Sequence, residues 1–151
     1  MSAAGVPFIG VLATCSPDQG RPPRFASVHQ HRLNVQDCCV VHSDLGMAAD
    51  IGTWVTIGHG AVMRGARIAD HVMIGMHATV MSGAVIGEGS IGGANSFVPY
   101  RCEFPPGCLV VGSPARLLRP LEEAEREHHR IACETYLQLI ADYRAGKWQK
   151  P

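Results

Sequence analysis

Branched apolar residues recur at every sixth position through the middle of the chain. The step is six at each interval from residue 68 to residue 86, and two more steps lead to residue 98 across Gly92. A period of six fits neither a helix nor a hairpin strand and is typical of a hexapeptide solenoid, in which three short strands and three corners form each coil. We therefore expect these residues to be buried, with a void or an inward-shifted neighbour at Gly92. They are Ile51, Ile57, Ile68, Ile74, Val80, Ile86 and Val98.

The segments on either side of the repeat are predicted to lie outside the β-helix. Residues 1–33 contain Pro17, Pro22 and Pro23 and are interpreted as a divergent lead-in, before a β-helix over 34–119. Residues 120–151 predict a helix and tail, because acidic residues suit the first turn of a helix and an apolar stripe follows. We expect that stripe to pack on the side of the solenoid, with Tyr136 a candidate to reach a site and His128 and His129 on the solvent face. The stripe consists of Cys133, Tyr136, Leu137, Ile140 and Tyr143.

Composition narrows the class of protein. The chain has 151 residues, which fits one domain, and 13 basic residues balance 13 acidic ones. This balance argues against nucleic-acid binding, which needs a basic surface. The sequence shows neither a run long enough to span a membrane nor a secretory signal, and its six cysteines lack disulfide-like spacing. The lead-in is mildly basic, as organelle transit peptides are, so the expected location is the mitochondrial matrix side or the bacterial cytoplasm.

Four strings carry a resemblance to a known family: NVQDCCVVHSD (34–44), TIGHGAVMRG (56–65), IGMHATVMSGAVIG (74–87) and VVGSPARLLRP (110–120). Together they resemble the γ-class carbonic anhydrases of the hexapeptide-repeat superfamily. The resemblance implies a left-handed parallel β-helix with a C-terminal helix. It also implies a homotrimer or a heterotrimer with homologous chains, and a zinc site between adjacent subunits.

The metal site departs from the family pattern of three histidines. His42 and His59 match the first two positions, but Arg64 stands at the third. Arginine keeps its proton and has no lone pair for a metal, whereas a catalytic zinc generally needs three protein ligands. Zinc is thus possible only with a substitute ligand, for which His77 is the first candidate. Arg64 can instead pair with Asp37 or with an anion such as bicarbonate.

Gln36 and Asp37 match family positions that orient zinc-bound water and cross the subunit interface, so with Arg64 they form the candidate catalytic set. Corner residues that satisfy backbone groups are the alternative interpretation of Gln36 and Asp37. The family's upstream arginine-x-aspartate element has no match in residues 1–33.

Three functions compete, and the sequence does not decide whether the chain is an enzyme. The first is an assembly subunit with an incomplete zinc site, resembling the carbonic-anhydrase-like chains in heterotrimers on the membrane arm of mitochondrial respiratory complex I. The second is an active zinc enzyme that hydrates carbon dioxide to bicarbonate. The third is a hexapeptide acyltransferase or thioesterase that uses His42 or His59 as a general base.

Overall fold

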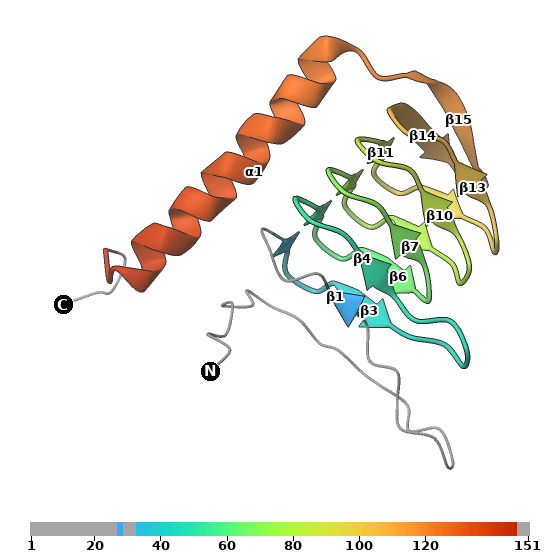
Figure 1. Cartoon of the computed structure of the whole chain (residues 1–151), viewed down its shortest axis with the longest axis horizontal. Coiled ribbons are helices and arrows are strands. Elements are labelled where there is room, and N and C mark those ends of the chain that lie inside the picture. The colour runs from blue at the N-terminus through green and yellow to red at the C-terminus, as the bar shows by residue number, and fades with distance from the viewer. Residues whose placement is uncertain (1–26, 29–32, 148–151) are drawn as a thin grey trace.

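The chain folds as a left-handed parallel β-helix with a helix along one side (Figure 1). The computed structural model describes residues 27–28 and 33–147. Three parallel sheets form the walls of the solenoid, and a final strand closes one of them in the antiparallel direction. The architecture confirms the expected fold class.

Each sheet takes one short strand from every coil. The first sheet contains β1 (Ser27–Val28), β4 (Asp50–Ile51), β7 (Arg67–Ile68), β10 (Val85–Ile86) and β13 (Glu103–Phe104). The second contains β2 (Asn34–Val35), β5 (Thr56–Ile57), β8 (Met73–Ile74), β11 (Ile91–Gly92), β14 (Cys108–Gly112) and β15 (Ala115–Pro120). The third contains β3 (Val40–His42), β6 (Val62–Arg64), β9 (Thr79–Val80) and β12 (Phe97–Val98). Strand β1 falls in the segment interpreted as lead-in and pairs with β4.

The coils are regular except for one insertion beside β3. Strand pairs that follow the insertion are 17 residues apart, as for Asp50 and Arg67, or 18, as for Arg67 and Val85, whereas His42 pairs with Arg64 at a separation of 22. The extra residues form a loop after His42, closed by an antiparallel bridge between Asp44 and Met47. This loop brings Asp44 back towards the third sheet.

The residues predicted to be anchors form the core. Ile51, Ile57, Ile68, Ile74 and Ile86 are all at most 1% exposed. At Gly92 the neighbouring isoleucine supplies the packing, because the Cδ1 atom of Ile74 lies 3.4 Å from the position a Cβ would take.

Helix α1 (Glu123–Arg144) runs back along the solenoid from the β15 end (Figure 1). Its start is fixed by Arg119, which holds the Glu125 carboxylate with two hydrogen bonds of 2.7 and 2.9 Å, while Glu122 N donates to the same carboxylate at 2.9 Å. The expectation for His129 was wrong. His129 is buried, because it lies one turn before Cys133 on the face that packs against the solenoid.

Two sequence expectations concern membranes and disulfides. Within the described ranges, no helix is both long and apolar enough to cross a bilayer. Cys38, Cys39, Cys102, Cys108 and Cys133 are all free thiols.

Candidate functional site

The first group of candidate residues, the Arg64 cluster, consists of His42, Asp44, Arg64 and Ser82. Strands β3 and β6 pair in parallel and place His42 opposite Arg64. The Arg64 guanidinium meets Asp44 Oδ1 through Nε and Nη2, each at 2.9 Å. Ser82 Oγ donates to the other oxygen of Asp44, and His42 Nε2 lies 3.4 Å from Oδ1. The Asp44 carboxylate therefore joins the three other side chains.

The Asp44 carboxylate and the Arg64 guanidinium each hold the other in its charged form. Burial by itself raises the pKa of Asp44, but hydrogen bonds from Ser82 and Arg64 and the positive charge of Arg64 outweigh it and hold the pKa below its usual value. The hydrogen bond to Asp44 in turn raises the pKa of Arg64. Arg64 is thus a permanent cation beside His42.

The second group, the Gln36 cluster, consists of Gln36, Asp37, His59 and Tyr136. Gln36 lies just after β2, and His59 lies two residues after the paired strand β5. Gln36 Nε2 donates to the Tyr136 hydroxyl at 2.7 Å, and Gln36 Oε1 accepts from the backbone N–H of His59 at 3.1 Å. Asp37 Oδ2 lies 3.7 Å from His59 Nδ1. Helix α1 thereby fixes the orientation of the Gln36 amide.

The two clusters lie at opposite ends of one strand segment. His59 lies in the turn before β6 and Arg64 is the last residue of β6, so the two clusters occupy successive corners of the coil. Zinc ligands must each lie about 2 Å from the ion. The described residues contain no group of three histidine, cysteine or acidic side chains placed to hold such an ion, and His42 and His59 belong to different clusters.

His77 lies one coil beyond His59. Its backbone N–H donates to the carbonyl of His59 at 2.8 Å. Its ring packs against the corner at Gly60, with Nδ1 2.5 Å from where a Cβ on that glycine would stand. Gly60 has a φ of 69°, so the corner needs glycine both for its conformation and for this ring. The structure thus places His77 near the Gln36 cluster and in a packing role.

The donor set around His42 does not fit the zinc of a three-histidine site. Arg64, opposite His42, offers no lone pair and carries a fixed charge that repels a dication. The expected pairing of Arg64 with Asp37 is wrong, because the loop after β3 supplies Asp44 instead, while Asp37 lies at His59.

Sequence reasoning missed Asp44 and Ser82, and spacing contains a signal for Ser82 alone. Asp44 lies in the loop after β3, where the repeat gives no register. Ser82 follows Arg64 by 18 residues, which is one coil of the repeat. Tyr136, a candidate to reach a site, does so through Gln36.

Comparison with known proteins places the chain in a family. No family model matches it. It is 53% identical over 106 residues to a probable carbonic anhydrase of Methanocaldococcus jannaschii, covering 70% of this chain and 67% of the relative. The chain belongs to the γ-carbonic anhydrase-like family of hexapeptide-repeat proteins. Another relative of this γ-carbonic anhydrase-like chain is the carnitine operon protein CaiE of Escherichia coli K12, 36% identical over 137 residues and matched over 67% of its length.

Solved structures agree with the fold of this γ-carbonic anhydrase-like chain. A putative acetyltransferase of Bacillus cereus superposes with a TM-score of 0.74 at 32% identity, covering 76% of this chain and 66% of that one. A hexapeptide transferase family protein of Anaplasma phagocytophilum gives a TM-score of 0.69 at 33% identity, covering 75% and 66%.

Proposed function

We propose that this chain is a γ-carbonic-anhydrase-like assembly subunit whose zinc site is incomplete, and that it has little or no hydratase activity as a homo-oligomer. The observation that carries the proposal is the position of Arg64 opposite His42 in the β3–β6 ladder, with its guanidinium held by Asp44. A cation anchored there repels a zinc ion by charge.

The family resemblance supports a trimer, in which His42 of one subunit would approach His59 of the next. The separation of the two clusters within one chain agrees with this arrangement. Each chain would then contribute His42 to one subunit boundary and His59 to another. Homologous partner chains in a heterotrimer can supply a histidine that this chain lacks.

A more specific version of the proposal places the chain on the membrane arm of mitochondrial respiratory complex I. It rests on the resemblance to the carbonic-anhydrase-like subunits, since the relatives reported above are archaeal and bacterial. Its test is whether the chain copurifies with that complex from its native source, and recovery apart from the complex would contradict it.

An active enzyme is the second candidate, and the 53% identity to a probable carbonic anhydrase favours it. Acyl transfer is a third, favoured by the likeness to the Bacillus cereus putative acetyltransferase and the Anaplasma hexapeptide transferase family protein. Stopped-flow hydration of carbon dioxide and release of thiol from acetyl-coenzyme A separate the three proposals.

The experiment compares the unmodified homo-oligomer with Arg64→His. We expect the unmodified protein to hydrate carbon dioxide no faster than buffer, and Arg64→His to gain zinc, because an imidazole replaces the cation beside His42. Activity of the variant can stay low, since the upstream arginine-x-aspartate element is absent. Arg67→His is the matched control, because it places the same new side chain at an exposed position of strand β7, and it should gain no zinc. Rapid hydration by the unmodified protein would overturn the proposal.

A further inference from the structure

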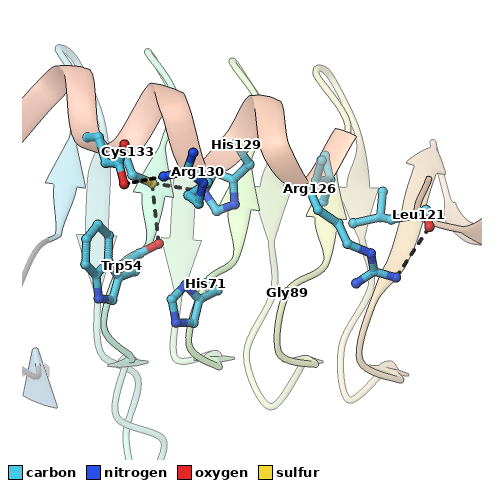
Figure 2. Close-up of a pocket in the computed structure, with 10 residues that line it drawn as sticks. Trp54, His71, Gly89, Leu121, Arg126, His129, Arg130 and Cys133 are labelled. Atoms are coloured by element: carbon cyan, nitrogen blue, oxygen red, sulfur yellow. Dashed lines mark hydrogen bonds and ion pairs between the residues drawn. The ribbon is translucent and has the colours of Figure 1, made fainter. Parts of the chain in front are cut away.

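A cavity of about 420 Å³ lies between helix α1 and one edge of the solenoid, separate from both clusters described above (Figure 2). Its solenoid wall includes Trp54, His71 and Gly89, and its helix wall includes Arg126, His129 and Cys133. The volume is in the range of small-molecule sites, which are mostly apolar with a few placed polar groups.

One end of the cavity has an aromatic wall. Trp54 and His71 occupy successive corners on the same edge, and their rings stack with centroids 5.9 Å apart at an interplanar angle of 14°. A glycine, Gly89, takes the next corner, and among the described residues beyond its chain neighbours the one atom within 4 Å of its missing Cβ is Arg126 Nη1, at 4.0 Å. The space between the aromatic wall and Arg126 is therefore open.

The other end of the cavity carries the cation Arg126, which has no carboxylate partner among the described residues. Within the described part of the chain, the contact of the Arg126 guanidinium is a long hydrogen bond of 3.4 Å to the carbonyl of Leu121, and no acidic side chain pairs with it. Arg126 also stands in the first turn of α1, where the helix dipole already favours negative charge. By contrast, Arg130 is neutralised by Glu127 at 2.6 Å and Glu134 at 2.5 Å.

The floor of the cavity is uncharged, and the one carboxylate in the lining, Glu134, is paired with Arg130. His129 Nε2 and Cys133 Sγ lie 3.3 Å apart, and the same thiol lies 3.4 Å from Thr56 Oγ1. Burial lowers the pKa of His129, helped by His71 and His128, and burial raises the pKa of Cys133 against the opposing bond from Thr56. Both groups are therefore neutral at physiological pH, so Arg126 sets the charge of the site.

We propose that this cavity binds a small planar organic monoanion of the aromatic carboxylate class, with its ring against Trp54 and His71 and its carboxylate on Arg126. The site is independent of the carbon dioxide chemistry discussed above, because its side chains come from other corners and from the start of the helix.

The test uses benzoate as the probe, with benzamide as a matched uncharged ligand and acetate as a matched anion without a ring. Calorimetry on the unmodified protein should give saturable benzoate binding at least about tenfold tighter than that of benzamide, as a charge-assisted hydrogen bond provides. Acetate should bind more weakly than benzoate. In a Trp148→Phe background, Trp54 is the one remaining tryptophan, and its emission should change with the same saturation curve.

Two variants locate the contact. Arg126→Gln should lower benzoate affinity to the level of benzamide, whereas Arg116→Gln should leave it unchanged, because Arg116 lies outside the cavity lining and donates to the carbonyl of Ala115. Circular dichroism checks that both variants fold. Absence of saturable benzoate binding, equal binding of benzoate and benzamide, or equal loss in the two variants would overturn the proposal. The comparison of ligands on the unmodified protein decides the matter even where Arg126→Gln fails to fold.

Discussion

Tyr136 connects the C-terminal helix to the segment that carries Gln36. Its hydroxyl accepts a hydrogen bond from Gln36 Nε2 at 2.7 Å, and the other end of the same amide accepts from His59 N at 3.1 Å. An amide held at both ends has one orientation rather than two. At this scale, the helix acts as a positioning element for the Gln36 cluster.

We predict that Tyr136→Phe lowers the free energy of unfolding by about 0.5–1.5 kcal/mol, because the Gln36 amide loses one partner. A double-mutant cycle with Gln36→Leu measures the coupling between the two side chains in denaturant unfolding. Additive effects of the two substitutions would show that the hydrogen bond contributes nothing to stability.

The residues of the candidate site were predictable in part. The resemblance supplied His42, His59 and Arg64, and strand pairing bears out that His42 and Arg64 are neighbours. The partner of Arg64 was not predicted, because an insertion after His42 breaks the period of the repeat. Counting residues by coils then no longer shows which residues lie opposite each other. Spacing alone could not show that Asp44 would turn back to meet Arg64.

At the scale of the elements, a column of isoleucines forms the interior of the solenoid. Side chains such as Ile57, Ile74 and Ile86 are at most 1% exposed, while Met73 and Val85, which precede Ile74 and Ile86 on their strands, are only partly buried. The six-residue period gave these positions correctly, because one inward side chain per strand is the geometric rule of the fold. The helix was predicted as well. The burial of His129 was not, because the predicted apolar stripe begins at Cys133 and His129 lies one turn before it.

Ile74→Ala should cost about 2–5 kcal/mol of unfolding free energy, since the side chain is 1% exposed and also fills the space beside Gly92. The measurement is the midpoint of denaturant unfolding at constant slope. Met76→Ala is the control, because Met76 is 52% exposed and its loss leaves no cavity. An Ile74→Ala midpoint equal to that of the unmodified protein would contradict the phase assigned to the repeat.

At the scale of the whole molecule, the solenoid is short and its outer surface is not uniformly polar. Phe97 is 36% exposed and Tyr100 is 52% exposed at the third sheet and the corner after it, which is the sheet that carries His42 and Arg64. Repeat arrays of this length commonly need a covering partner. The fold was predictable from the sequence, whereas the partner was not, because a single chain encodes an interface only as exposed side chains.

We expect the purified chain to be a trimer at micromolar concentration, either alone or with homologous chains, with His42 and His59 near the subunit boundary. Sedimentation velocity across a range of concentrations measures the assembly. Replacing Phe97 with Glu should shift the distribution towards smaller species, whereas Ile131→Glu on the helix should not, although Ile131 is 50% exposed. A monomer at micromolar concentration would contradict this expectation.

The central claim is that Arg64 takes the place of a metal ligand, and the zinc content of the unmodified homo-oligomer tests it most directly. The protein is purified with zinc present, dialysed to remove loosely bound metal, and analysed by elemental mass spectrometry against protein concentration. The account predicts well under one zinc per family site in the unmodified protein and a higher value in Arg64→His. Full zinc occupancy in the unmodified homo-oligomer would contradict it and would show that another side chain, His77 first among the candidates, completes the site.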